Sequence, residues 1–122
     1  AILTQVKTLP AGRGLSYGHA DTTSGNERIG TLAVGYGDGF RRSPGNLALV
    51  GGKRVPVVGR VCMDQVLVQL DSVPEARAGD AAVLIGEQAA ERLRAEDLAR
   101  AWGTITYEVV CGITARVPRR HG

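Results

Sequence analysis

Aromatic residues are scarce in this chain, since three tyrosines, one phenylalanine and one tryptophan make up 4% of its 122 residues. A chain so poor in aromatics does not use phenol rings as bulk packing, so the positions of its tyrosines carry information. Tyr17 lies in Gly14-Leu-Ser-Tyr-Gly18, Tyr36 in Gly35-Tyr-Gly-Asp-Gly39 and Tyr107 in Gly103-Thr-Ile-Thr-Tyr-Glu108. A phenol donates or accepts one hydrogen bond and, if its pKa is lowered, acts as a base. We therefore expect a small polar site that is assembled from several loops.

Long apolar runs and metal-binding clusters are also missing. No run approaches the ~20 residues of a membrane span, and no charged-then-apolar segment opens the chain, so we expect neither a membrane protein nor export. Cys62 and Cys111 match no metal or redox spacing, and His19 and His121 stand alone. We expect no metal. The apolar neighbours of both cysteines predict free, buried thiols in a reducing, cytoplasmic compartment.

The formal net charge is +3, with basic residues gathered at Arg41-Arg42 and in the tail at Arg116, Arg119 and Arg120. Binding to nucleic acid would require a basic stripe interleaved with exposed aromatics. Here the tyrosines lie in glycine-rich loops, away from the arginine tail. The pattern favours solvated chain ends and a small anionic ligand, and we expect no nucleic-acid partner.

Glycine is abundant and spread along the chain, at 17 of 122 residues, or about twice the usual share. Such a distribution indicates many turns between short strands. Strands are expected at 1–9, 27–36, 47–50, 53–58, 61–70, 82–85 and 115–117, with a long polar loop at 10–26 whose length favours a function. Gly51-Gly52 predicts a hairpin, and Pro56 assigns part of its second arm to a sheet edge or a bulge.

One helix is clear, over residues 89–102, where Ala90, Leu93, Leu98 and Ala99 form an apolar stripe before the stop signal Gly103. Residues 104–113 alternate like a strand, but Thr104 could cap a short helix, and we favour the helix. The fold expected is mostly β, a small partly open Greek-key β-barrel of about six to eight short strands with one or two short helices.

Each motif has an ordinary structural explanation when it is taken alone. Tyr17 could stabilise a loop with its hydroxyl, and Gly35–Gly39 could be a strand-ending turn with Asp38 as a turn residue. Asp64 stands in the expected strand 61–70, where β preference disfavours aspartate, so it needs a partner such as Arg60, Arg42 or a backbone amide. A structural ion pair explains Asp64 almost as well as a site does.

The motifs taken together resemble the C-terminal domain of the alanine racemase family. The resemblance runs through Val6-Lys-Thr-Leu-Pro-Ala-Gly, Leu15-Ser-Tyr-Gly, Val34-Gly-Tyr-Gly-Asp-Gly, Val58-Gly-Arg-Val-Cys-Met-Asp-Gln, Gly79-Asp, Gly103-Thr-Ile-Thr-Tyr-Glu-Val and Arg116-Val-Pro-Arg. It implies that residues 1–122 are the C-terminal β domain of a pyridoxal-phosphate enzyme that interconverts L- and D-alanine, the latter for cell-wall peptidoglycan. Family members hold the cofactor in an N-terminal (β/α)8 barrel, absent from this chain, and work as head-to-tail homodimers in which each C-terminal domain completes the other subunit's site.

The resemblance also assigns roles to individual residues. Tyr17 would be the base that takes the proton from L-alanine, opposite the cofactor lysine of the barrel. Met63 would bind the substrate carboxylate through its backbone N–H, Tyr36 would line the entrance near that carboxylate, and Tyr107 would hydrogen-bond the cofactor phosphate. Arg42, Arg60, Asp64 and Ile105 would line the corridor through which substrate enters.

Two features bear on these expectations. Gly37 stands where alanine is common in the family, and neither of the two lysines, Lys7 and Lys53, resembles the cofactor lysine. We therefore predict that this chain alone neither binds the cofactor covalently nor racemises alanine. A broader-specificity amino-acid racemase of the same fold, or a stand-alone β-barrel binding module without catalysis, are the alternative interpretations.

Overall fold

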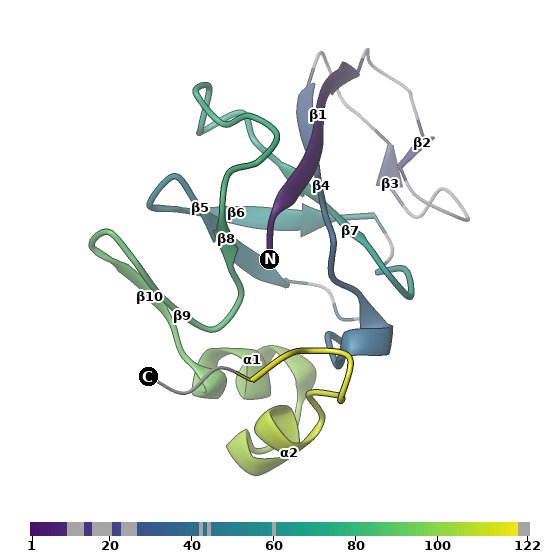
Figure 1. Cartoon of the computed structure of the whole chain (residues 1–122), viewed down its shortest axis with the longest axis vertical. Coiled ribbons are helices and arrows are strands. Elements are labelled where there is room, and N and C mark those ends of the chain that lie inside the picture. The colour runs from purple at the N-terminus through teal and green to yellow at the C-terminus, as the bar shows by residue number, and fades with distance from the viewer. Residues whose placement is uncertain are drawn as a thin grey trace.

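The chain folds into an antiparallel sheet with two helices at one end, in a computed structural model that describes residues 1–9, 14–15, 21–22, 27–41, 43, 45–59 and 61–119 (Figure 1). Six strands form the main sheet in the order β1-β4-β7-β6-β5-β8. Their bounds are β1 Leu3–Leu9, β4 Glu27–Leu32, β7 Val66–Gln69, β6 Lys53–Val58, β5 Leu47–Val50 and β8 Ala82–Val83. Two short pairs accompany them, β2 Gly14–Leu15 with β3 Asp21–Thr22, and β9 Gly86–Gln88 with β10 Glu91–Leu93. The helices are the 3₁₀ turn η1 Tyr36–Asp38, α1 Ala95–Trp102 and α2 Thr106–Cys111.

The two edges of the main sheet approach each other without forming a continuous ladder. Ile2 makes an isolated bridge to Ala81, and the N–H of Leu3 donates to the carbonyl of Asp80 at 2.9 Å. The N–H of Gly79 donates back to Leu3 at 2.7 Å. These contacts curl the sheet into a partly open barrel, so the expected fold class, mostly β with one or two short helices, is confirmed.

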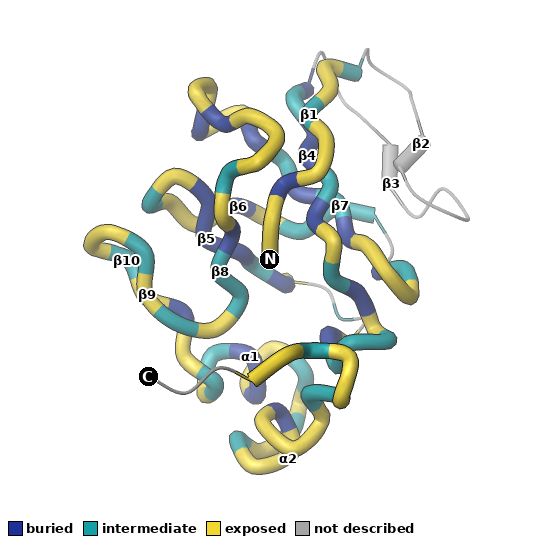
Figure 2. Tube along the Cα trace, in the orientation of Figure 1, coloured by how far each residue is buried: buried dark blue, intermediate teal, exposed yellow. Residues whose placement is uncertain are grey.

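The core lies inside this curled sheet (Figure 2). Its fully buried side chains are mainly branched aliphatic, including Leu3, Leu32, Leu49, Val50, Val55, Val66, Val68 and Leu70. Gly30 lies at the centre of β4 opposite Val68, and a Cβ there would lie 2.7 Å from both Leu3 and Leu70. The glycine therefore leaves the space that two core leucines fill.

The hairpin expected at Gly51-Gly52 is confirmed. β5 pairs with β6 in register Val50↔Lys53, and both glycines have positive φ, 60° and 77°, as a two-residue type I′ turn requires. β6 is an interior strand, yet it has no β7 partner along Lys53–Pro56, so the expectation that part of this arm forms an edge is confirmed. Its pairing with β7 covers only Val57 and Val58, so Pro56 removes no hydrogen bond from that ladder.

The helix expected from residue 89 begins at Ala95 instead, and residues 86–93 form the β9–β10 hairpin. Ala89 has a positive φ of 53°, which a helix interior excludes. The carboxylate of Asp97 accepts the N–H of Arg94 at 2.7 Å and closes the first helical turn. Leu93 is buried from β10 rather than from the helix, so the apolar spacing crossed an element boundary.

Other boundaries also differ from the expectations. The strand expected over 61–70 starts at Val66, that over 27–36 ends at Leu32, that over 82–85 ends at Val83, and residues 115–117 form a turn. The short helix expected in 104–113 is confirmed as α2, although Ile105 rather than Thr104 is its N-cap.

The expected burial of the cysteines is wrong for Cys111, which is exposed on α2, and Cys62 is only half-buried. A six-residue helix presents most of its residues to solvent, so apolar neighbours along the chain do not ensure burial. None of the helices in the described ranges is both long enough and apolar enough to span a membrane.

Candidate functional site

Five of the eight site residues expected from the sequence lie in described parts of the structure, whereas Tyr17, Arg42 and Arg60 lie outside the described residues. Tyr36 begins η1, and Met63 and Asp64 lie in the loop between β6 and β7. Ile105 and Tyr107 lie at the start of α2. The expected residues therefore fall on two parts of the fold.

The first part is a pair of loops held together by backbone hydrogen bonds. The N–H of Tyr36 donates to the carbonyl of Cys62 at 3.0 Å, and the N–H of Gly37 donates to that of Met63 at 2.9 Å. A Cβ at Gly35 would lie 2.0 Å from the carbonyl oxygen of Cys62. Only glycine permits this close approach. The Gly-Tyr-Gly motif therefore packs directly against the loop that follows β6.

The side chain of Asp38 stabilises the loop that contains Tyr36. This side chain is 14% exposed, one carboxylate oxygen accepts the N–H of Gly35 at 2.9 Å, and the other pairs with Arg116 Nε at 3.4 Å. The backbone of Thr114 donates to the carbonyl of Asp38 at 3.1 Å, and its hydroxyl donates to that of Gly37 at 2.8 Å. The segment after α2 is thereby joined to η1.

Arg116 continues the chain of contacts to Asp64, with which Nη2 forms a close ion pair. The hydrogen bond to Asp64 is the main cause that raises the pKa of Arg116. Asp64 therefore has an ion-pair partner in Arg116, from the segment after α2, whereas Arg60 and Arg42, the partners suggested by the sequence, lie outside the described residues. Asp64 also lies before β7 rather than within a strand, so the strand interpretation of this residue is wrong.

Asp38 and Arg116 are the residues of this cluster that sequence reasoning did not place in the site. From the sequence Asp38 could be a simple turn residue, and Arg116 belongs to a basic tail that is expected to be solvated. The one local signal was the position of Asp38 three residues after Gly35, where its carboxylate reaches back to the Gly35 N–H.

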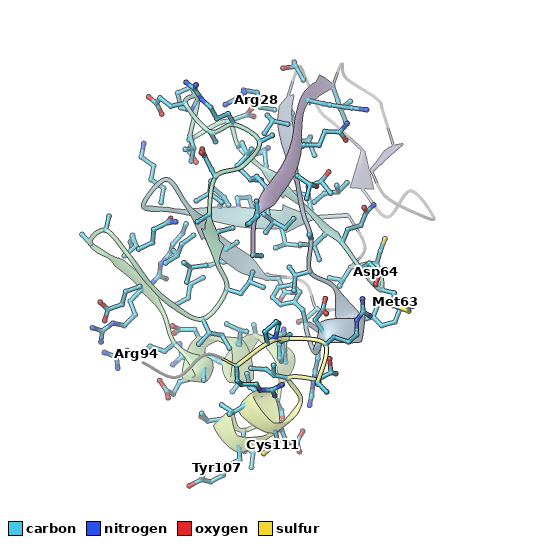
Figure 3. All side chains as sticks on the ribbon, viewed as in Figure 1. Arg28, Met63, Asp64, Arg94, Tyr107 and Cys111 are labelled. Carbon is cyan, nitrogen blue, oxygen red and sulfur yellow. The ribbon has the colours of Figure 1, made fainter. Side chains whose placement is uncertain are left out.

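Met63 and Tyr36 are large and exposed beside this cluster, at 49% and 45%. The carbonyl of Met63 accepts the N–H of Gly37, whereas the N–H of Met63 donates no hydrogen bond to a described residue. Figure 3 shows Met63 and Asp64 projecting together from the side of the molecule. This loop therefore offers a backbone donor to a group outside the described chain.

The second part is α2 with its N-cap, where Ile105, Tyr107 and Val110 are 60%, 79% and 53% exposed. Figure 3 shows Tyr107 pointing out from the bottom of the molecule, away from Met63 and Asp64, so the described chain does not bring these residues together. The helix is anchored by Glu108, whose carboxylate accepts the hydroxyl of Thr104 at 2.6 Å and pairs with Arg41 at 3.2 Å. These two bonds, that from Thr104 first, lower the pKa of Glu108.

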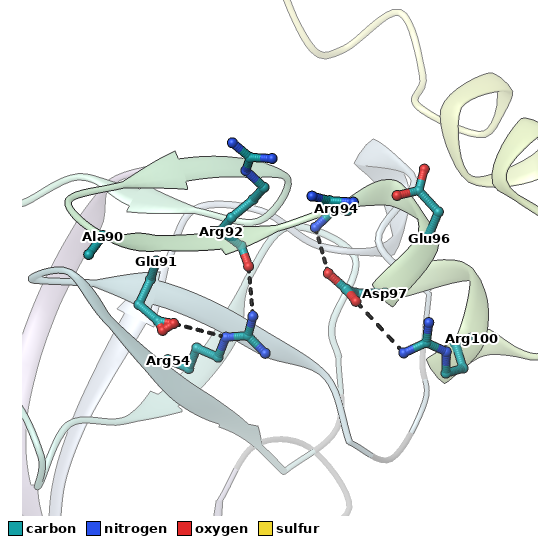
Figure 4. A pocket seen from close by; sticks show the side chains of 8 residues that line it. All are labelled: Arg54, Ala90, Glu91, Arg92, Arg94, Glu96, Asp97 and Arg100. Atoms are coloured by element: carbon teal, nitrogen blue, oxygen red, sulfur yellow. Dashed lines mark hydrogen bonds and ion pairs between the residues drawn. The ribbon is translucent and has the colours of Figure 1, made fainter.

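A groove of ≈ 630 Å³ lies elsewhere, between β6, the β10 strand and the start of α1 (Figure 4). Its arginines are largely paired: Arg54 with Glu91 at 3.4 Å, and Arg100 with Asp97 at 3.9 Å. Arg92 pairs with Glu87. Four arginines and three acidic residues line the groove, so it keeps a small excess of positive charge.

The described residues contain no group of three or more metal-ligating side chains. Pyridoxal phosphate would find an exposed phenol at Tyr107 but no lysine beside it. Lys7 lies on β1, and Lys53 on β6 donates to the carbonyl of Ser72 at 3.1 Å. The described residues thus fit a contributing contact to such a cofactor and not its covalent attachment.

Comparison with known proteins gives a single family. The model for "Alanine racemase, C-terminal domain" matches residues 1–121. The alanine racemase of Symbiobacterium thermophilum is 50% identical over 119 residues, which are 96% of this chain and 32% of that protein. That of Halothermothrix orenii is 45% identical over 121 residues, covering 98% of this chain and 32% of that protein.

Solved structures agree with this match. The alanine racemase of E. faecalis superposes with a TM-score of 0.94 at 40% identity, covering 99% of this chain and 32% of that one. That of Bacillus anthracis with bound L-Ala-P superposes with a TM-score of 0.90 at 42% identity, covering 95% and 30%. The chain spans about a third of the length of these relatives. It belongs to the alanine racemase family, as the C-terminal domain.

Proposed function

We propose that this chain supplies a proton-transferring tyrosine and the substrate-carboxylate contacts to a pyridoxal-phosphate-dependent alanine racemase. The observation that carries the proposal is the braced pair of loops that leaves the Met63 N–H without an acceptor in the described chain, in a domain of this family. The cofactor would be held mainly by an N-terminal barrel outside this chain. The match to only a third of each relative supports such a second part.

Binding of alanine would begin with its carboxylate. The N–H of Met63 would donate to it, and Tyr36, on the neighbouring loop, would stand close by. The two loops are hydrogen-bonded to each other, so donor and phenol keep a fixed separation. In this role the identity of the Met63 side chain matters less than the path of its backbone.

Racemisation requires the α-proton to leave on one face and return on the other. Bound pyridoxal phosphate would delocalise the charge left at the α-carbon. Tyr17 would take the proton of L-alanine through its phenol oxygen, which requires a pKa well below the usual ~10. Tyr107 would hold the phosphate through its hydroxyl, and Arg42, Arg60, Asp64 and Ile105 would line the corridor.

The assembly would be a homodimer in which this domain completes the site of the second subunit. The exposed large side chains Tyr36, Met63, Ile105, Tyr107 and Val110 support a covered surface in the full enzyme. Neither cysteine forms a disulfide within the described residues, which agrees with a cytoplasmic enzyme.

The test of the proton-transfer role uses the full-length enzyme. Tyr17→Phe removes the hydroxyl and keeps the ring, so L-to-D turnover should fall by orders of magnitude while the folded enzyme is retained. Circular dichroism checks the fold, and NMR follows exchange of the α-proton in D₂O. Turnover equal to that of the wild type would remove Tyr17 from the base role.

The carboxylate contact is tested by a pair of variants at one position. Met63→Pro removes the N–H, and Met63→Leu keeps it with a similar volume. KM for alanine should rise about tenfold or more in the proline variant and stay within about twofold in the leucine variant. Equal effects of the two would assign the contact to the side chain instead.

The chain alone should neither racemise alanine nor attach the cofactor. After incubation with pyridoxal phosphate and borohydride reduction, its mass should be unchanged at Lys7 and Lys53. A stable adduct at either lysine would contradict the division of roles between the two domains.

A further inference from the structure

We propose that Arg116 is a positioning residue of this site, whose guanidinium sets the distance between the loop of Tyr36 and the loop of Met63. Its effect on substrate rests on the proposed function, whereas its effect on the loops rests on contacts within the described chain alone.

The guanidinium reaches both loops from a third segment of the chain. Arg116 follows α2, and its side chain is 45% exposed. Nε lies 3.4 Å from the carboxylate of Asp38 in η1, and Nη2 pairs with the carboxylate of Asp64, next to Met63. Nη1 covers Gly37, where a Cβ would lie 1.9 Å from it. Each nitrogen is therefore directed at one of the two loops.

The charges explain why the cation is needed between them. The carboxylate of Asp38 is largely buried, and within the described residues it also accepts the neutral N–H of Gly35. Within the described chain Arg116 pairs with both Asp38 and Asp64, so its loss removes that compensating charge from both carboxylates. A largely buried carboxylate that loses its cation is destabilising, and this cost would act against the hydrogen bonds from Tyr36 to Cys62 and from Gly37 to Met63.

The loop contact is the part of the site most sensitive to such a displacement. The carbonyl of Met63 accepts from Gly37, and its N–H belongs to the same backbone. A shift of this loop moves the donor proposed for the substrate carboxylate relative to Tyr36. Misplacement of a binding donor weakens substrate binding before it changes the chemistry at the α-carbon.

Arg119 offers a matched control from the same segment. Its guanidinium donates to the carbonyls of Ile113, Thr114 and Val117, at 2.7 to 3.0 Å. Those bonds bind the segment to itself and reach neither loop. The segment after α2 also stays attached to η1 in any Arg116 variant, because the hydroxyl of Thr114 donates to the carbonyl of Gly37.

The kinetic arm of the test compares Arg116→Gln, Arg116→Lys and Arg119→Gln in the full-length enzyme. We expect Arg116→Gln to raise KM for both enantiomers of alanine about tenfold with a smaller change in kcat. Lysine keeps the charge but not the fork geometry, so it should restore part of the affinity. Arg119→Gln should stay within about twofold of the wild type. An unchanged KM in Arg116→Gln, or an equal rise in Arg119→Gln, would overturn the proposal.

The structural arm measures amide hydrogen exchange of the same proteins without substrate. The amides of Tyr36 and Gly37 should exchange about tenfold faster in Arg116→Gln than in the wild type, and at wild-type rates in Arg119→Gln. If the enzyme lacks racemase activity but exchange is faster, the proposed function fails and the positioning role stands. Exchange at wild-type rates in an active Arg116→Gln enzyme overturns the positioning role alone.

Discussion

Replacement of Asn46 by alanine should destabilise the fold by breaking a side-chain link between the sheet and the helices that uses a buried amide. Asn46 is 3% exposed and precedes β5. Its oxygen accepts the indole N–H of Trp102 in α1 at 2.7 Å, and its amide nitrogen donates to the carbonyl of Arg41 at 3.0 Å. The side chain thus joins three segments.

The expected loss of unfolding free energy follows from the two polar groups that Asn46→Ala leaves without a partner. The indole N–H of half-buried Trp102 would lose its acceptor, at a cost of about 1–3 kcal/mol for a buried donor and less where water reaches it. The carbonyl of Arg41 lies in an exposed residue and can bond to water. We expect the free energy of unfolding to fall by about 2 kcal/mol, with most of the loss from the indole.

Urea unfolding followed by fluorescence gives a direct measurement, because Trp102 is the only tryptophan in the sequence. Ser43→Ala is the matched control, since the Ser43 hydroxyl donates to the carbonyl of Ala101 at 2.7 Å and links the same segments at an exposed position. The control should change the unfolding free energy by no more than about 0.5 kcal/mol. If Asn46→Ala costs no more than Ser43→Ala, the buried amide does not stabilise the junction as argued.

Two further predictions concern packing and pH. Gly30→Ala places a methyl group 2.7 Å from Leu3 and Leu70 and should lower the unfolding free energy by about 1–3 kcal/mol, measured by the same titration; a neutral result would show that the leucines reorient freely. Because the folded state lowers the pKa of Glu108, its stabilising contribution is complete above the unfolded pKa of about 4.3 and is lost as the pH falls through the lower folded value. The melting temperatures of wild type and Glu108→Gln should therefore differ at pH 6 and converge near pH 2, and a constant difference across that range would contradict the assignment.

The features that the sequence predicted correctly are those with a local physical cause. Gly51-Gly52 specifies its hairpin because both residues must adopt positive φ. The start of α1 was misplaced because Ala90 and Leu93 mimic a helical stripe. The positive φ of Ala89 and the cap at Arg94 become visible only once the β9–β10 hairpin packs beside β5.

The site shows the same division between local and distant causes. The motif around Tyr36 was visible because glycines flank it, and the Asp38 carboxylate returns to Gly35 within three residues. The pairing of Asp64 with Arg116 joins positions 52 apart in the sequence, and no short pattern specifies it. The sequence alone does not distinguish an arginine that is solvated in a basic tail from one that forms ion pairs with two carboxylates.

The braced loops place different demands on neighbouring positions. At Gly35 a side chain would collide with the backbone carbonyl of Cys62, which cannot move without separating the loops. At Met63 the side chain is half exposed while the carbonyl is fixed by Gly37. If the Met63 N–H donates to the substrate carboxylate, a substitution at Gly35 should disturb that contact more than a substitution of the Met63 side chain. The reason is that Gly35 fixes the position of the backbone that carries the Met63 N–H. Sequence freedom at position 63 is therefore compatible with a strict binding geometry, and the site is specified by how closely two loops approach.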